Sequence, residues 1–162
     1  MRLPPTDRGS IYGVPVTGTK CPATWDKRVR EAAALIDMPT AFAQAGANYA
    51  ELDTRAGLEH AAKALLAACG DIRGWQLMAA SSRAERVVGA ALMIDHDAST
   101  TASLRVLVVD VNTSSGTLLA RASERARRAG AIEVVGVALH TLGPCAPAAA
   151  DCLLDELHVV NT

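Results

Sequence analysis

The passage from Leu104 to Leu139 constrains the fold of this chain most. It has the pattern of a buried strand, a short polar loop, an amphipathic helix and a second buried strand. Leu104–Val109 is an apolar, β-branched run typical of a parallel strand that is covered on both faces, and we expect Asp110 to end it with a charge. This order of elements predicts an α/β domain whose sheet is mainly parallel, with helices on both faces.

The loop between this strand and the helix is rich in hydroxyl groups and small side chains. Its residues are Asn112, Thr113, Ser114, Ser115, Gly116 and Thr117. Free N–H groups at a helix start, the positive end of the helix dipole and several hydroxyl donors together suit a phosphate group. The alternative is an ordinary polar loop in which a Thr or Ser only caps the helix, a contribution of about 1 kcal/mol. The loop taken alone leaves both interpretations open.

The passage resembles the motif that binds 5-phosphoribosyl-1-pyrophosphate (PRPP) in type I phosphoribosyltransferases, an apolar strand followed by D-D-V-x-T-T-G-x-T and a helix. The better register places Val109–Thr117 on these nine positions, with Val109 in place of the first acid and a serine in place of the glycine. A register shifted by one residue restores the glycine as Gly116 but places Val111 on the second acid. Either register keeps Asp110 and lacks one acid.

Two further stretches extend this resemblance toward the competence-associated ComF branch of the family. Ser82–Leu92 is similar to the segment S-x-A-E-R-x-x-N-V-x-G-A-F that precedes the PRPP strand, and Gln76 matches a glutamine slightly upstream of it. Ala34–Pro39 and Gly46–Ala50 are similar to the family's V-P-V-P strand and R-G-F-N-Q-A turn. The arginines with which the family holds pyrophosphate between these two pieces are absent here.

The resemblance implies a phosphoribosyltransferase-like protein that binds PRPP, a nucleotide or ribose 5-phosphate. Asp110 would hold the ribose as the surviving acid of the catalytic pair, the loop residues would hold the 5′-phosphate, and Arg83 and Arg86 would be the remaining candidates for pyrophosphate. Mg²⁺ would enter only with bound PRPP, and Asp95–Asp97, with three potential metal ligands, is interpreted as a solvated turn. Because one acid and the pyrophosphate arginines are missing, we expect transferase activity to be reduced or absent. The alternative is a non-catalytic sensor or assembly protein that acts through a protein partner, with a link to DNA uptake as in its relatives.

Composition limits the remaining function classes. At 162 residues the chain fits one domain, and its 50% apolar but only 3% aromatic residues indicate a core of Ala, Val and Leu. The net charge of −1 and the lack of a dense Lys/Arg cluster argue against direct binding of nucleic acid. No run of 18 apolar residues or signal-like start is present, so we expect a cytoplasmic protein without a membrane segment. Four scattered cysteines without a C-x-x-C pair indicate small buried side chains and no zinc ribbon.

The other elements follow from periodicity and breakers. We expect a loose stretch over residues 1–10, a domain over residues 11–143 and a helical extension of it over residues 144–162 that could cap the site or pair subunits into a homodimer. The individual elements expected outside the motif are an edge strand at Ile11–Thr17, helices at Asp26–Ile36, Ala56–Cys69 and Ala148–Leu157, and strands at Trp75–Ala80 and Arg86–Ile94.

Overall fold

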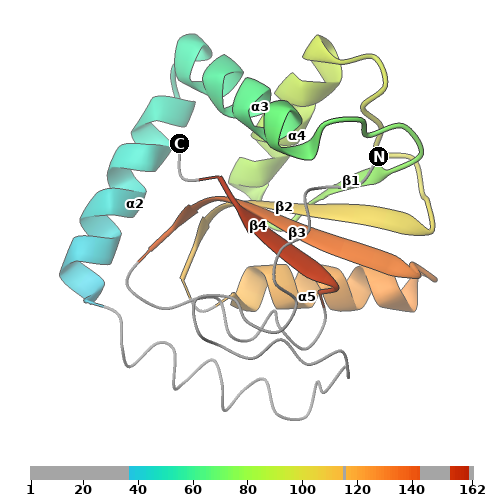
Figure 1. Ribbon diagram of the computed structural model, residues 1–162. Coiled ribbons are helices and arrows are strands. Elements are labelled where there is room, and N and C mark those ends of the chain that lie inside the picture. Colours follow the sequence, from blue (N-terminus) through green and yellow to red (C-terminus); the bar gives the residue numbers. More distant parts are fainter. Residues whose placement is uncertain (1–36, 115, 143–153, 161–162) are drawn as a thin grey trace.

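The computed structural model describes residues 37–114, 116–142 and 154–160 (Figure 1). The helices in this part of the chain are α2 (Met38–Leu52), α3 (Arg55–Cys69), α4 (Ser82–Ile94) and α5 (Thr117–Arg128). The strands are β1 (Gln76–Ala79), β2 (Arg105–Thr113), β3 (Glu133–Thr141) and β4 (Glu156–Val159). They form one sheet in the order β1-β2-β3-β4, and every neighbouring pair is parallel. The predicted α/β class and parallel sheet are confirmed.

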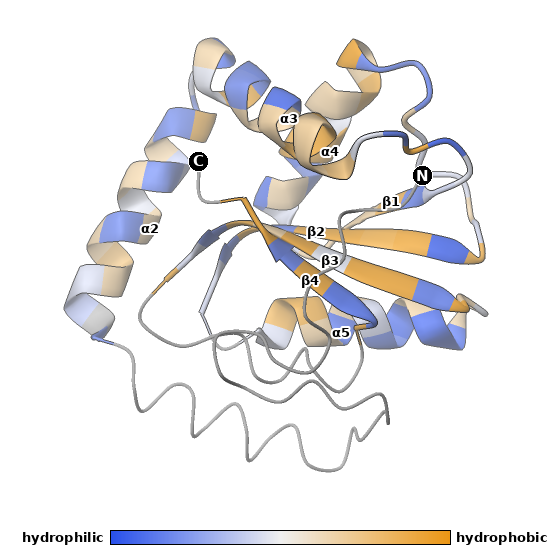
Figure 2. Ribbon diagram, in the orientation of Figure 1, coloured by the Kyte–Doolittle hydropathy of each residue, from blue (hydrophilic) through white to orange (hydrophobic). Residues whose placement is uncertain are grey.

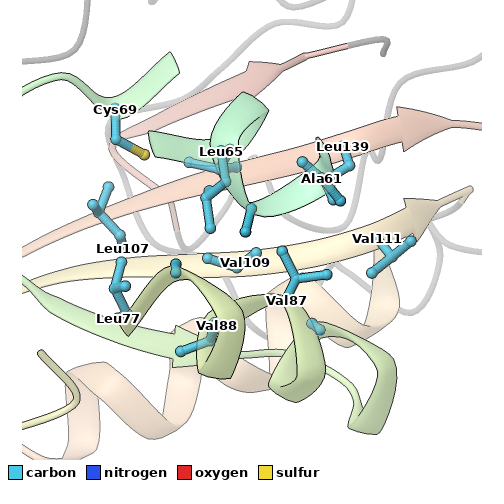
Figure 3. Packing of buried hydrophobic residues seen from close by; sticks show 14 of the residues in the cluster. Ala61, Leu65, Cys69, Leu77, Val87, Val88, Leu107, Val109, Val111 and Leu139 are labelled. Atoms are coloured by element: carbon cyan, nitrogen blue, oxygen red, sulfur yellow. The ribbon is translucent and has the colours of Figure 1, made fainter. Parts of the chain in front are cut away.

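Helices cover both faces of the sheet, with α3 and α4 on one face and α5 on the other (Figure 1). Successive side chains of β2 therefore pack into two separate cores. Leu107, Val109 and Val111 pack toward α3 and α4 (Figure 3), whereas Val106 and Val108 pack toward α5. Burial on both faces explains why β2 is an almost continuous apolar run.

The two crossover connections of the sheet differ in hand. The connections β1-α4-β2 and β2-α5-β3 advance in the same direction across the sheet, but α4 and α5 lie on opposite faces. One of the two crossovers is therefore left-handed, against the strong preference for right-handed ones. As a consequence, the β1–α4 and β2–α5 turns leave adjacent strands toward opposite faces of the sheet.

The carboxyl end of the sheet is polar and is bordered by α2. Figure 2 shows apolar strand centres that give way to hydrophilic residues at the strand ends beside α2. Asp110, Asn112 and Thr113 are the buried polar residues of β2 in this region. The apolar run of the sequence thus ends in buried polar side chains at the carboxyl end of β2.

The predicted strand at Arg86–Ile94 is wrong, because these residues belong to α4. The side chain of Ser81 accepts a hydrogen bond from the N–H of Ala84, 3.2 Å away, and so begins the helix. Val87, Val88 and Ala91 fit one helical face against the core as well as they fit a strand. A short apolar run alone does not distinguish a helix from a strand.

The strand and turn suggested by Ala34–Pro39 and Gly46–Ala50 are also corrected, because α2 runs without interruption through the described part of both. Pro39 lies in the first turn of α2, where its missing N–H leaves no hydrogen bond unmade. Residues 34–36 lie outside the described residues. The resemblance at this point was thus one of sequence and not of local structure.

The other expected elements divide into three groups. The helix predicted at Ala56–Cys69 and the strand predicted at Trp75–Ala80 are confirmed as α3 and β1. The helix predicted at Ala148–Leu157 is wrong in its last residues, because β4 pairs there with β3. Residues 148–153 and the elements expected at residues 11–17 and 26–36 lie outside the described residues.

Candidate phosphate-binding site

The strand that leads into the site is longer than predicted. β2 continues to Thr113, and Asn112 and Thr113 pair in register with His140 and Thr141 of β3. Asp110 is therefore an interior residue of β2, only 2% exposed, and the expectation that it ends the strand is wrong. The added β pairing replaces the loop conformation expected for residues 112 and 113.

The turn from β2 into α5 depends on a glycine. Gly116 is the N-cap of α5 with φ of +83°, a left-handed conformation that residues with a Cβ rarely adopt. The N-cap residue itself has no side chain with which to cap the first turn of α5. The start of α5 therefore lies beside this turn, and the N–H groups of a helix start favour an anion.

A pocket of about 100 Å³ lies between the end of β2 and the start of α5. It is lined by Asp110, Asn112, Thr113, Ser114, Gly116, Thr117 and Leu118. The structure therefore brings together nearly all of the residues predicted to bind the phosphorylated ribose; Ser115 lies outside the described residues. We call this cavity the polar pocket.

Two buried side chains of the polar pocket lack hydrogen-bond partners within the described part of the chain. They are the amide nitrogen Nδ2 of Asn112 and the hydroxyl oxygen Oγ1 of Thr113, in residues that are 8% and 2% exposed. Buried polar groups are nearly always paired, and an unpaired one costs about 1–3 kcal/mol. Both residues line the polar pocket, so two polar groups without a partner among the described residues lie at its wall.

Asp110 supplies the only ionisable side chain among the described residues that line the polar pocket. Its Oδ1 accepts hydrogen bonds from the N–H of Val111 at 2.9 Å and from Oγ of Ser81 at 3.3 Å. Burial raises the pKa of Asp110 to about 6, and these two hydrogen bonds oppose the rise. The carboxyl group can therefore accept a hydrogen bond from a ligand hydroxyl when ionised and can donate one when protonated.

The position of the missing acid faces away from the polar pocket. Val109 and Val111, which occupy it in the two possible registers, are both buried in the core beneath α3 and α4 (Figure 3). Side chains alternate along a strand, so neither can reach the pocket that Asp110 lines. Of positions 109, 110 and 111, only 110 therefore lines the polar pocket, so only one carboxylate from these positions can lie there.

Arg83 and Arg86, the candidates for binding pyrophosphate, do not line the polar pocket. The guanidinium of Arg83 stacks on the ring of Tyr49, 3.7 Å from its centre, and Nη1 of Arg86 lies 2.8 Å from Oδ1 of Asp53. Their segment is a helix whose polar side faces α2 and the turn after it. Both arginines therefore connect α4 to α2 and to the turn that follows α2.

Residues of α2 contribute a second pocket that sequence reasoning missed. This cavity, about 270 Å³ in volume, is lined by Ala41, Phe42, Ala45, Tyr49, Asn112, Ser114, Leu118 and Leu142, and we call it the apolar pocket. Asn112, Ser114 and Leu118 line both pockets, so the two cavities adjoin. In the sequence, only the similarity of Gly46–Ala50 to the family's turn drew attention to this part of the chain. That similarity did not predict that α2 would form a wall of the site.

The described part of the chain shows no group of three His, Cys, Asp or Glu side chains that could hold a metal ion. Within the same residues, no helix combines the length and apolar character needed to cross a bilayer. No protein-family model, curated protein or solved structure matches the chain.

Proposed function

We propose that the protein binds the 5′-phosphate of a phosphorylated ribose compound in the polar pocket. The observation that carries this proposal is the pair of buried polar groups on Asn112 and Thr113 that have no partner among the described residues, close to the start of α5, whose N-cap is Gly116. A phosphate oxygen accepts hydrogen bonds from the amide, the hydroxyl and the backbone N–H groups together. Such a group fits a cavity of about 100 Å³, whereas a larger ligand must extend beyond it.

The ligand class follows from what surrounds the phosphate. Asp110 offers a carboxylate to a ribose hydroxyl, as the resemblance to the PRPP motif implies. The adjoining apolar pocket offers the aromatic side chains of Phe42 and Tyr49 to a flat group attached to the ribose. A nucleotide would use both pockets, whereas ribose 5-phosphate would use one, so we favour a nucleotide or PRPP as the ligand.

We further propose that the protein is phosphoribosyltransferase-like and that its transferase activity is reduced or absent. It has one acid at the ribose site, and no Lys or Arg is among the described residues that line either pocket. Removal of one charge-assisted hydrogen bond costs about 1.5–3 kcal/mol, which is roughly a ten- to hundredfold loss of rate. Mg²⁺ would enter only as part of bound PRPP.

Calorimetry with a matched pair of glycine variants tests this proposal. Gly116→Ala forces a Cβ into a left-handed conformation in the polar pocket, and Gly130→Ala makes the same change where φ is +100° at the far end of α5. We expect Gly116→Ala to weaken binding of a nucleoside monophosphate or of PRPP with Mg²⁺ by about tenfold or more, because the N–H groups shift. Gly130→Ala should bind like the wild type.

Equal affinities of the two glycine variants, or no binding by the wild type at millimolar ligand, would refute the phosphate site. A pyrophosphate-release assay with PRPP, Mg²⁺ and a panel of bases measures the activity separately. Binding without pyrophosphate release is the expected result. Release at a rate typical of an enzyme, about 1 per second or faster, would instead show an active transferase.

A role as a protein-binding component is the second candidate, and one surface favours it. A groove of about 310 Å³ between α3 and α4 is lined by Leu58, Ala90, Met93 and Ile94 with Arg55 and Glu59 at its border. Met93 and Ile94 are 88% and 43% exposed, so two neighbouring apolar side chains of this groove face outward together. If a partner binds there, Met93→Glu should abolish the complex without altering nucleotide affinity.

A further inference from the structure

We infer that Asn48 of α2 is a positioning residue, which holds the Asn112 amide so that its NH₂ group faces the ligand. This inference rests on the proposed phosphate site and assigns a role to a residue outside the β2–α5 motif. Nδ2 of Asn48 donates a hydrogen bond to Oδ1 of Asn112 at 2.5 Å, across 64 positions of sequence. Asn48 is therefore brought to the site only by the packing of α2 at the end of the sheet.

The chemistry of an amide explains how this contact acts. A primary amide has an accepting oxygen and a donating NH₂ group on opposite sides of one carbon, so a partner that holds the oxygen fixes the direction of the NH₂ group. Nδ2 of Asn112 has no partner among the described residues, and Asn112 lines both the polar and the apolar pocket. With Asn48 as donor, Asn112 presents a donor to an oxyanion ligand.

The segment around Asn48 is itself held in place. Tyr49, the next residue, lies beneath the guanidinium of Arg83, and Asp53, just after α2, pairs with Arg86. These two contacts join the C-terminal half of α2 to the first turns of α4. A side chain on this part of α2 can therefore keep a fixed direction toward β2.

Replacement of Asn48 by the isosteric aspartate reverses the hydrogen bond. Asn48→Asp leaves a group that only accepts when ionised, so Asn112 must rotate its amide and donate NH₂ to the new carboxylate. Asn112 would then present its carbonyl oxygen to the ligand, and two oxygens repel. We expect Asn48→Asp to weaken binding of inorganic phosphate and of a nucleoside monophosphate by about tenfold or more.

The added negative charge needs its own control, and α2 provides one. Gln44 lies one helical turn before Asn48, is exposed and lines neither pocket, so Gln44→Glu makes the same amide-to-carboxylate change outside the site. Gln44→Glu should bind phosphate within about threefold of the wild type at 0.15 M salt, where a charge about one turn away is partly screened. The ratio of the phosphate affinities of the two variants separates the effect of the amide orientation from the effect of the added charge.

A spectroscopic readout distinguishes orientation from a structural role. In the wild type, the side-chain NH₂ signals of Asn112 in a ¹⁵N–¹H spectrum should shift on addition of phosphate. In Asn48→Asp they should already occupy a hydrogen-bonded position and should not respond. If Asn48→Asp fails to fold, Asn48→Ala takes its place, with an unfixed Asn112 amide and an expected loss of affinity of about three- to tenfold.

The outcomes separate this inference from the proposed function. Absence of phosphate binding by the wild type refutes the phosphate site. If the wild type binds phosphate and Asn48→Asp matches Gln44→Glu in affinity and in its Asn112 signals, the site stands and the positioning role of Asn48 is refuted. A selective loss in Asn48→Asp, with unresponsive Asn112 signals, supports it.

Discussion

At the scale of single residues, Asp110 combines two properties that oppose each other. It is a carboxyl group in the interior of a buried strand, and it is also part of the wall of the polar pocket. Two hydrogen bonds, from Ser81 and from the N–H of Val111, offset part of the cost of burying its charge. A costly buried group that lines a cavity is typical of a functional site.

The pKa of Asp110 predicts how stability changes with pH. The folded protein binds the proton with a pKa of about 6, against an ordinary value of 3.8, so the native state holds more protons than the unfolded state between these values. Stability should therefore fall as pH rises from about 4 to about 6 and stay level above, by up to about 3 kcal/mol from this group. Asp110→Asn should lack this fall and should be the more stable form at pH 8.

Asp71→Asn provides the control for this experiment. Asp71 is exposed, and its hydrogen bonds with Arg73 lower the pKa of its carboxyl group. Its contribution to stability is therefore present above the ordinary pKa of 3.8 and lost only at lower pH, so Asp71→Asn should keep the wild-type fall between pH 4 and 6. Urea unfolding at pH 4, 6 and 8 measures all three proteins. A fall in stability that persists in Asp110→Asn would show that another group titrates.

At the scale of elements, β2 assigns alternate residues to two environments. Leu107, Val109 and Val111 belong to the core beneath α3 and α4, and Asp110 and Asn112 belong to the pocket. Val109 and Val111 are fully buried in that core, so an acid at either position would lie among apolar side chains and not in the polar pocket.

Val109→Asp tests that packing. The change buries an unpaired carboxyl group among apolar side chains and should destabilise the protein by several kcal/mol without any gain in PRPP affinity. Val109→Ala separates the loss of volume from the charge and should cost about 2 kcal/mol. Thermal unfolding measures the stability of both variants, and titration with PRPP measures their affinity. A folded Val109→Asp protein with tighter PRPP binding would show that position 109 faces the ligand.

A second pair of variants tests how β4 completes the sheet. A Cβ on Gly136 of β3 would lie 2.6 Å from Cδ1 of Leu154 and 2.9 Å from Cδ1 of Leu157, so these leucines fill the space above the glycine. Gly136→Ala should therefore destabilise the protein by about 1–3 kcal/mol through overpacking. Gly89→Ala in α4, where a Cβ meets nothing within 4 Å, should stabilise it by about 0.5–1 kcal/mol. Similar effects of both changes would argue against the tight packing of β4 on β3.

At the scale of the whole molecule, the site is assembled from four distant parts of the chain. The end of β2 and the start of α5 supply the polar pocket, α2 supplies half of the residues of the apolar pocket, Leu142 after β3 supplies another, and the β1–α4 turn supplies Ser81. The opposite hands of the two crossovers place α4 and α5 on opposite faces of the sheet, and Ser81 contacts Asp110 from the β1–α4 turn. A left-handed crossover is uncommon, so this placement of the two helices is a particular feature of the sheet.

The sequence by itself determined the local features. The apolar run before Asp110 predicted a strand buried on both faces, and the stripe of Leu and Ala in residues 56–69 predicted α3, because side-chain periodicity reports directly on burial. The hydroxyl-rich loop and Gly116 predicted the turn into α5 and most of the polar pocket, since neighbours in sequence are neighbours there in space.

Only the tertiary structure decided what depends on contacts between distant residues. Arg86–Ile94 formed a helix because α4 can bury one of its faces against α3 and the sheet, whereas its apolar run is equally compatible with a strand. Asp110 became an interior residue of β2 because the pairing with β3 continues beyond it to Thr113. Asn48 reached Asn112 because α2 packs at the end of the sheet, and no local pattern encodes a contact between residues 64 positions apart.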